Sequence, residues 1–362
     1  MKPTQALHEL GQSLWLDNIT RDMLDDGTLR HYIEAYSVTG LTSNPSIFDA
    51  AIEQGGSYDA DIRALAARGV AAEPLFLELA LADLRRAADL FAPVHARSGG
   101  VDGWVSMEVS PLLVDDIAGS VKAALAIHAA AQRDNLFVKI PATPAGVLAI
   151  EEAIFAGVPI NVTLLFDWQQ YQASANAYLR GIERRIAAGL DPRVASVASL
   201  FISRWDAASH EAVPEHLRNK LGLAVAGRTY RVFRELLDSP RWRALAAAGA
   251  LPQRLLWAST GTKDPSLPTN YYVAALAAPG TIDTIPEKTL LAFDADADSE
   301  VPAPQPMAAD GEDADAMLAR FGDARIDISA LATRLQRDGA AAFVKSWNSL
   351  LGRITAKSGP PA

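Results

Sequence analysis

The sequence predicts an α/β fold: a single (β/α)₈ TIM barrel with additional helices, including a C-terminal helix that packs on the barrel. Short apolar runs alternate with longer, alanine-rich amphipathic segments, and this alternation implies parallel strands joined by crossover helices. Eight strand-like runs occur, which fits a closed barrel better than an open sheet. The length of 362 residues suits one such barrel with a few extra helices.

The eight predicted strands are short runs dominated by large apolar side chains. In chain order they are LWLD (14–17), VTGLTSN (38–44), WVSMEV (104–109), LFVKIP (136–141), INVTLLF (160–166), VASLFIS (197–203), RLLWAST (254–260) and TIDTIP (281–286). Between them, stretches such as LELALADLRRAADLF (77–91) and DIAGSVKAALAIHAAAQ (116–132) place apolar residues three and four positions apart. This spacing gives each predicted helix one apolar face to pack on the strands.

Local signals mark where two of the helices begin. Thr143 followed by Pro144 predicts an N-cap and a first helical residue, where the missing N–H of proline costs nothing. Asn44-Pro45-Ser46 ends the second strand in a similar way, just before the next helix. Both signals lie directly after predicted strands, as strand–helix alternation requires.

Residues 1–362 are expected to form one domain. The stretch 294–316 is acidic, rich in proline and poor in large apolar residues, so we interpret it as a surface excursion of the barrel without an assigned role. The stretch ISALATRLQRDGAAAFVKSWNSLL (328–351) has the apolar periodicity of a helix that packs back on the body.

Composition excludes several classes of protein. A net charge of −10 argues against a nucleic-acid surface but not against an anionic small substrate, which needs only a local basic pocket. The absence of cysteine removes disulfides, thiolate metal sites and cysteine nucleophiles, and the six scattered histidines do not predict a metal site. No apolar run approaches the ~18 residues of a membrane helix, and the first residues lack the apolar core of a signal peptide. We therefore expect a cytoplasmic protein without a cofactor, while a monomer and a homodimer both stay open.

Lys139 lies in the middle of NLFVKIPAT (135–143), a run that otherwise reads as a buried strand. One interpretation is a structural lysine whose long stem carries the charge back to solvent. The other is a desolvated amine that acts as a nucleophile towards a carbonyl group. The stretch alone does not decide between them.

Polar residues recur near the carboxyl ends of the other predicted strands, where barrel enzymes build their sites. They are Asp17, Thr42, Asn44, Glu108, Asn161, Thr163, Ser199, Arg204 and Ser259, and the apolar Phe201 shares a strand face with Ser199 and with Ser203, which directly precedes Arg204. Pairs such as Asn161 and Thr163 stand two apart and so share one face of a strand. Because buried charges are costly unless they satisfy one another, a lysine surrounded by these groups predicts a site.

Each of these residues also has an ordinary interpretation. Asp17 could cap a helix that begins around Thr20, and Glu108 could be a strand end that faces solvent. Asn161 and Thr163 could be a hydrogen-bonded pair in the core, and Asn44 could simply make the turn before the following proline.

The combination of these motifs resembles the transaldolase family. The residues that carry the resemblance are LWLDN, TGLTSNPSIF, SMEVSP, LFVKIPAT with AGVLAIEEAI, GVPINVTLLF and ISRWD, and the match runs from about residue 12 to about residue 290. Transaldolases are aldolase-type barrels with a Schiff-base lysine on the fourth strand, which is where Lys139 is predicted to lie.

The resemblance implies a role for each residue. Lys139 would form the Schiff base with a ketose phosphate, Asp17 would exchange the proton of the C4 hydroxyl, and Glu108 with Thr163 would move protons through a water. The groups that would hold substrate hydroxyls and the enamine are Thr42, Asn44, Asn161 and Ser199. Arg204 matches the family's phosphate-binding arginine. The implied activity moves a dihydroxyacetone unit from sedoheptulose 7-phosphate or fructose 6-phosphate to glyceraldehyde 3-phosphate or erythrose 4-phosphate, in the non-oxidative pentose phosphate pathway.

The chain departs from the family pattern after the seventh strand. Better-known members carry a second arginine there, whereas this chain reads ASTGTKDPS, so Lys263 with Ser259 is the expected replacement. One alternative is a fructose-6-phosphate aldolase, which releases the three-carbon unit to water. Those enzymes carry Gln and Tyr at the positions of Glu108 and Phe201, so this chain favours transfer. A second alternative, an inactive barrel with a binding role, lacks support because the lysine and both acids are present.

Overall fold

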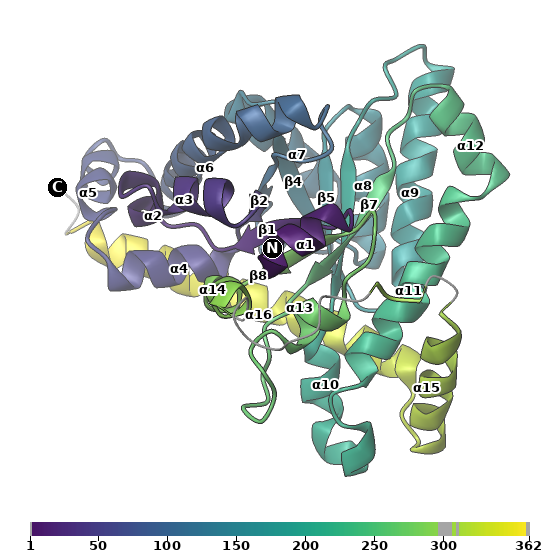
Figure 1. The fold of residues 1–362 in the computed structure, drawn as a ribbon. Coiled ribbons are helices and arrows are strands. Elements are labelled where there is room, and N and C mark those ends of the chain that lie inside the picture. Colours follow the sequence, from purple (N-terminus) through teal and green to yellow (C-terminus); the bar gives the residue numbers. More distant parts are fainter. Residues whose placement is uncertain (1, 296–305, 309–310, 360–362) are drawn as a thin grey trace.

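The computed structural model describes residues 2–295, 306–308 and 311–359, whose strands form one parallel sheet (Figure 1). In this described part the eight strands are β1 (Ser13–Asp17), β2 (Val38–Thr42), β3 (Val105–Glu108), β4 (Leu136–Pro141), β5 (Ile160–Leu165), β6 (Ser196–Phe201), β7 (Gln253–Ala258) and β8 (Ile282–Ile285). Their order in the sheet is β2-β1-β8-β7-β6-β5-β4-β3, so every strand except β2 pairs with its successor along the chain and β8 lies beside β1. The predicted (β/α)₈ barrel is confirmed.

The seam between β2 and β3 closes the barrel through a short contact. Gly40 and Trp104 form a parallel bridge, and Leu41 N–H donates to the Trp104 carbonyl at 2.9 Å. A side chain at residue 40 would place its Cβ 2.7 Å from the Trp15 ring and 2.8 Å from the Trp104 carbonyl oxygen. Glycine is therefore required at this seam.

Helices surround the strands and extend beyond them (Figure 1). Their bounds are α1 (Pro3–Glu9), α2 (Arg21–Asp25), α3 (Thr28–Ala35), α4 (Pro45–Gln54), α5 (Asp59–Ala67), α6 (Ala72–Arg97), α7 (Ile117–Ala131), α8 (Pro144–Phe155), α9 (Trp168–Ala187), α10 (Ser203–Ser209), α11 (Leu221–Leu237), α12 (Pro240–Ala247), α13 (Tyr271–Ala275), α14 (Glu287–Ala295), α15 (Glu312–Asp323) and α16 (Ile328–Lys357). None of these helices is long and apolar enough to span a membrane.

The predicted helix starts are confirmed. The Thr143 hydroxyl accepts a hydrogen bond from Gly146 N–H, with Pro144 as the first helical residue of α8. Asn44 caps α4 by accepting from Ile47 N–H at 3.1 Å. Both caps follow a barrel strand directly, so they fix the direction in which the chain leaves the carboxyl end of the barrel.

The C-terminal helix α16 packs on the body, as its periodicity predicts. In Figure 1 it is the long yellow helix that crosses the molecule from the side of α15 to the side of α5. Its buried residues recur at helical spacing and contact α4, α5, α6 and the end of β5. Within the predicted excursion 294–316, residues 296–305 and 309–310 lie outside the described part, and α15 begins at Glu312.

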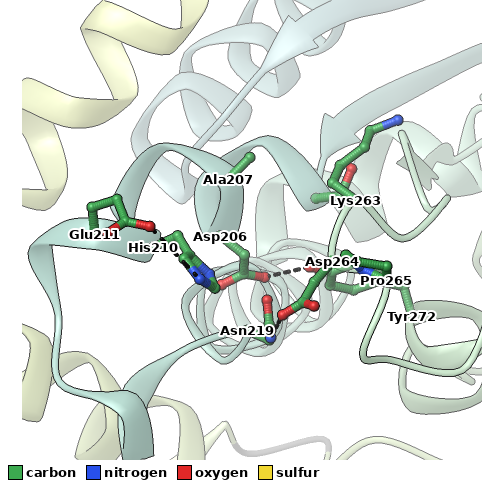
Figure 2. A pocket seen from close by; sticks show the side chains of 10 residues that line it. Asp206, Ala207, His210, Glu211, Asn219, Lys263, Asp264, Pro265 and Tyr272 are labelled. Atoms are coloured by element: carbon green, nitrogen blue, oxygen red, sulfur yellow. Dashed lines mark hydrogen bonds and ion pairs between the residues drawn. The ribbon is translucent and has the colours of Figure 1, made fainter.

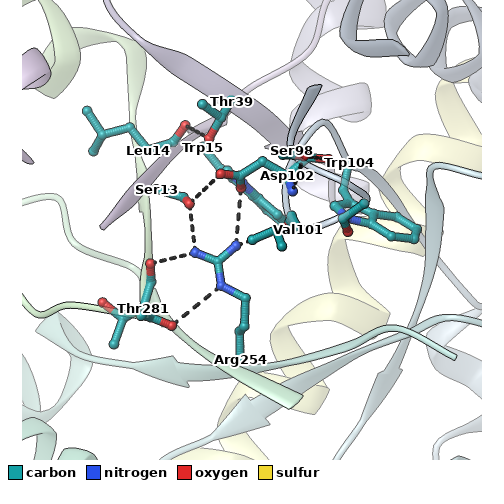
Figure 3. Close-up of polar contacts among 12 residues, drawn as sticks. Ser13, Leu14, Trp15, Thr39, Ser98, Val101, Asp102, Trp104, Arg254 and Thr281 are labelled. Atoms are coloured by element: carbon teal, nitrogen blue, oxygen red, sulfur yellow. Dashed lines mark hydrogen bonds and ion pairs between the residues drawn. The ribbon is translucent and has the colours of Figure 1, made fainter. Parts of the chain in front are cut away.

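An ion pair occupies the amino end of the barrel (Figure 3). The Arg254 guanidinium donates to Asp102 at 3.2 Å, to the Ser13 hydroxyl at 2.7 Å and to the Thr281 carbonyl at 2.9 Å. Asp102 also accepts from Ser13 at 2.7 Å and from the Trp15 indole at 3.2 Å. Charge and hydrogen bonding are thus matched where the first and the last two strands begin.

Candidate active site

Lys139 lies on β4 inside the barrel and is only 7% exposed. Its Nζ donates to the Ser43 carbonyl at 2.6 Å and lies 3.6 Å from Oε2 of Glu108. The interpretation of a lysine that reaches out to solvent is therefore wrong. The structure instead holds a desolvated amine between the ends of β2 and β3.

Glu108 ends β3 and is equally buried, so the interpretation of a solvent-facing strand end is also wrong. Its Oε1 accepts from the Thr163 hydroxyl at 3.3 Å, and its Oε2 has no hydrogen-bond partner among the described residues. Burial raises the pKa of this carboxyl, and the neighbouring Lys139 charge opposes that effect in part. A raised pKa suits an acid that must both hold and release a proton near neutral pH.

Asp17 ends β1 and faces the same interior. The Thr42 hydroxyl donates to it at 3.2 Å, while Thr20 caps α2 by accepting from Met23 N–H, so Asp17 is not the cap of that helix. Burial raises the pKa of Asp17, and the charge of Lys139 lowers it in part. The amine thus interacts electrostatically with two carboxyl groups from different strands, buried Glu108 and half-buried Asp17.

Neutral polar groups connect the strands between these charges. The Ser199 hydroxyl donates to Oδ1 of Asn161 at 2.7 Å, and the Asn161 amide donates to the Ser106 hydroxyl at 3.3 Å. Asn161 and Thr163 hydrogen-bond to partners on other strands, so the alternative interpretation of a pair between them is wrong. Asn44 makes the predicted turn and also lines the site.

Arg204 follows β6 at the start of α10 and brings a positive charge to the site. Burial lowers its pKa, and in the described part no carboxylate forms an ion pair with it. Its guanidinium carbon lies 5.2 Å from the centre of the Phe201 ring. A desolvated guanidinium without a carboxylate partner is suited to bind an anionic ligand.

Apart from Glu108, the predicted residues described so far line one small cavity of about 100 Å³ at the carboxyl end of the barrel. Its walls include Asp17, Thr42, Asn44, Lys139, Asn161, Thr163, Ser199, Phe201, Arg204 and Ser259. Sequence reasoning missed Thr284 of β8 and Phe343 of α16, which also line it. The period-two pattern of β8 could have identified Thr284, whereas nothing in the sequence shows what α16 faces.

Glu108 is one predicted site residue outside this lining, 3.6 Å from Lys139, and Lys263 is the other. Lys263 borders a second, more open pocket of about 320 Å³ together with Asp206, His210, Asn219 and Tyr272 (Figure 2). Figure 2 shows its side chain directed away from Asn219 and Asp264. The two pockets meet at Ser203 and Ser259, whose hydroxyl oxygens are 3.0 Å apart, and Lys263 is near enough to Asp17 to lower the pKa of that carboxyl slightly.

Ser259 has a positive φ of 58°, an uncommon conformation for a residue other than glycine. Such strain tends to concentrate at functional sites.

In the described residues no group of three or more histidine, aspartate or glutamate side chains could hold a metal ion. The groups present at the site include an amine, two carboxyl groups and several hydroxyls.

A parallel barrel that buries an amine beside two carboxyl groups, at the carboxyl ends of its strands, defines this protein as a barrel enzyme. A family model described as Transaldolase/Fructose-6-phosphate aldolase matches residues 14–354. The chain is 43% identical over 360 residues to a transaldolase of Arthrobacter sp. (strain FB24), covering 97% of this chain and 96% of that protein. It is also 43% identical over 364 residues to a transaldolase of Thiobacillus denitrificans (strain ATCC 25259 / T1), covering 98% and 100%. The chain belongs to the transaldolase/fructose-6-phosphate aldolase family.

Proposed function

We propose that this chain is a transaldolase that transfers a dihydroxyacetone unit between sugar phosphates through a Schiff base on Lys139. The observation that carries the proposal is the buried Lys139 amine, 3.6 Å from Glu108 and electrostatically coupled to Asp17, in a cavity that also contains Arg204. The family match and the transaldolase relatives support the same reaction.

The first step joins the Lys139 nitrogen to the ketose carbonyl carbon. The nitrogen attacks as a neutral amine, the carbonyl oxygen takes a proton, and the resulting carbinolamine loses its hydroxyl as water to form an iminium. Glu108 supplies and accepts these protons, with Thr163 holding its carboxyl in place at 3.3 Å. A proton relay of this type needs a carboxyl whose pKa burial has raised, as at Glu108.

The second step breaks the C3–C4 bond of the bound sugar. Asp17 takes the proton of the C4 hydroxyl, the C4 carbon leaves as an aldehyde, and the bonding electrons move into the iminium to give an enamine on Lys139. An acceptor aldehyde then enters, the enamine carbon attacks it, and Asp17 returns the proton. Hydrolysis of the new iminium releases the product ketose.

The substrate phosphate is proposed to bind Arg204, with Ser259 and Lys263 beside it. Of these three residues, only Arg204 is both charged and part of the cavity wall. We therefore expect Arg204 to contribute most of the binding energy for the phosphate. The substrate hydroxyls would contact Thr42, Asn44, Asn161 and Ser199, which the cavity already orients.

The test is a coupled assay of transfer from fructose 6-phosphate to erythrose 4-phosphate. Lys139→Met replaces the amine by an apolar chain of similar length and should abolish transfer while the protein stays folded. Lys122→Met, at an exposed lysine of α7, is the matched control and should retain full activity. Transfer by a folded Lys139→Met protein would refute the proposal.

Phe201 separates transfer from release of the three-carbon unit. Release requires a proton on the enamine carbon, and the Phe201 ring in the cavity wall offers none, whereas a tyrosine hydroxyl could donate one or position a water. Phe201→Tyr should therefore raise release of free dihydroxyacetone relative to transfer. Measuring both rates in one preparation cancels any loss of folded protein, and an unchanged ratio would mean that Phe201 only packs.

We further propose that the barrel and its extra helices form one domain, that the enzyme works in the cytoplasm, and that it forms a homodimer. The homodimer is supported by exposed Leu125 on α7 and exposed Leu148 on α8, two helices that pack against each other. Sedimentation of the wild type and of a Leu125→Glu, Leu148→Glu variant tests that part directly.

A further inference from the structure

One face of α16 lies over the carboxyl end of the barrel. Gln336, Gly339 and Phe343 stand three and four residues apart and so share that face. Phe343 lines the cavity beside Lys139, and the side chain of Gln336 is buried against the ends of β4 and β5. The helix thus contributes to the site itself as well as to the packing around it.

The Gln336 amide joins two backbone carbonyls. Its Nε2 donates to the Ala142 carbonyl at 2.9 Å and to the Leu164 carbonyl at 3.0 Å. Ala142 follows the last residue of β4, three residues after Lys139, and Leu164 directly follows Thr163. One amide group therefore holds the two strand segments that carry the Schiff-base lysine and the partner of Glu108.

The regular ladder between β4 and β5 ends at this point. Pro141 pairs with Thr163, and Ala142 N–H donates to the Thr163 carbonyl at 2.8 Å. The pairing of β5 with β6 then becomes irregular between Val162 and Leu165. Beyond the last β4–β5 pair, the Gln336 amide donates to the Ala142 and Leu164 carbonyls, so these carbonyls have donors that the neighbouring strand does not supply.

The backbone that Gln336 holds is strained. Leu164 has a positive φ of 56°, which costs of order 1–3 kcal/mol for a residue with a side chain and persists only where neighbours constrain it. The close approach of α16 depends on Gly339, because a Cβ there would lie 3.0 Å from Leu164 Cδ2 and 3.2 Å from Arg204 Nη1. The helix backbone thus comes within contact distance of both the strained residue and the proposed phosphate ligand.

We propose that Gln336 is a positioning residue of the active site: its amide holds the ends of β4 and β5 so that Lys139, Glu108 and Thr163 keep their reactive geometry. This inference rests on the proposed function, because it assigns Gln336 an effect on Schiff-base formation. Misplacement of reacting groups by about 1 Å can cost on the order of 10²-fold in rate, even when the mutation lies away from the chemistry.

The first variant is Gln336→Met, which keeps the length of the side chain and removes both donors. Borohydride trapping with fructose 6-phosphate should be slower by roughly 10- to 100-fold, and kcat should fall to a similar degree while KM stays unchanged. The control is Arg337→Met, the next residue on the same helix, whose side chain is 78% exposed. Both rates are divided by the folded fraction, measured by near-ultraviolet circular dichroism.

The second variant is Gln336→Glu, which keeps the shape and makes donation depend on pH. A protonated carboxyl donates one hydrogen bond to the facing carbonyls, whereas a carboxylate donates none and repels them. Its kcat relative to wild type should therefore be highest at low pH and fall as pH rises, because the donor is lost on ionisation. A merely structural role would leave this ratio flat once the folded fraction is taken into account.

The outcomes separate the inference from the proposed function. If the wild type traps sugar on Lys139 and Gln336→Met traps it at the wild-type rate per folded molecule, Gln336 is only a packing residue and the inference is overturned. A flat pH profile for Gln336→Glu overturns it as well. If the wild type traps no sugar, the proposed function itself fails.

Discussion

The two ends of the barrel bury the same kinds of charged group and treat them differently. At the amino end, Arg254 and Asp102 form an ion pair, and the remaining donors and acceptors shown in Figure 3 are matched. At the carboxyl end, Arg204 has no carboxylate partner among the described residues, and Lys139 and Glu108 are 3.6 Å apart. The amino-end charges form a direct, fully hydrogen-bonded ion pair, whereas at the carboxyl end the Lys139–Glu108 pair is longer and Arg204 has no carboxylate partner among the described residues.

This difference indicates where a ligand belongs. A desolvated charge that lacks a partner is costly, so a folded chain retains it only where something else completes it. The carboxyl end is also the end at which barrel enzymes place their loops and sites. The amino end therefore serves stability, and the carboxyl end serves chemistry at some cost in stability.

After Lys139→Met, the largest expected effect at the carboxyl end is that of Asp17→Asn. Asp17→Asn removes the acceptor for the C4 hydroxyl proton, so the Schiff base should still form while cleavage slows by ~10²–10⁴-fold. Rapid-quench measurement of aldehyde release after mixing with fructose 6-phosphate reports this step. Asp115→Asn, at an exposed aspartate after β3, is the control, and normal cleavage by Asp17→Asn would mean that Asp17 only supports Thr42.

A substitution at the amino end should lower the stability of the fold and leave the catalytic rate unchanged. Asp102→Asn keeps an acceptor for only one of Ser13 and Trp15, which donate to different oxygens, and leaves the largely buried Arg254 without a counter-charge. The free energy of unfolding should fall by about 3–5 kcal/mol. Urea denaturation measures that loss, and kcat measured where the variant is fully folded should equal that of wild type. A lower kcat in folded protein would show that the two ends are not independent.

Asp283 in the barrel wall provides a third case, because among the described residues it forms no ion pair. Both of its oxygens are buried without a hydrogen-bond partner among the described residues, and burial raises its pKa to about 7. Because the folded pKa exceeds the unfolded one, the free energy of unfolding should fall as pH rises from about 4 through 7, by at most about 4 kcal/mol. Asp283→Asn should remove that slope in denaturation at several pH values, and a slope unchanged from wild type would contradict this account.

The smallest effect is expected at Arg204. Arg204→Ala should raise KM for phosphorylated sugars by roughly 10- to 150-fold, the equivalent of about 1.5–3 kcal/mol for a charge-assisted contact. Activity on unphosphorylated dihydroxyacetone donors should hardly change. Equal losses on both kinds of substrate would make Arg204 a structural residue, like Arg254.

Much of this arrangement could be predicted from the sequence, because it depends on local patterns: short apolar runs, helix-capping residues and the alternation of side chains along a strand. The eight strands lie within one or two residues of the predicted runs at almost every boundary, and Thr143 and Asn44 cap helices as expected. Polar residues two apart on one strand had to share a face, which brought Asn161 and Thr163 to the interior.

The rest depends on contacts between distant segments, which no local pattern contains. The periodicity of 328–351 predicts a packed helix but does not reveal that Gln336 and Phe343 meet the active site. Whether Asp17 caps a helix or faces the active site depends on its hydrogen-bond partner. That partner is Thr42, which is 25 residues away along the chain. The sequence also does not reveal that Lys263, the predicted second phosphate ligand, borders the neighbouring pocket and not the small cavity.

The central claim is that the Lys139 amine forms the covalent intermediate. The direct measurement is borohydride reduction of the wild type with fructose 6-phosphate, followed by intact mass and peptide mapping. The account predicts one added sugar-derived group per chain, on the peptide that contains Lys139, and no addition to Lys139→Met. Addition at another lysine, or no addition at all, would contradict it.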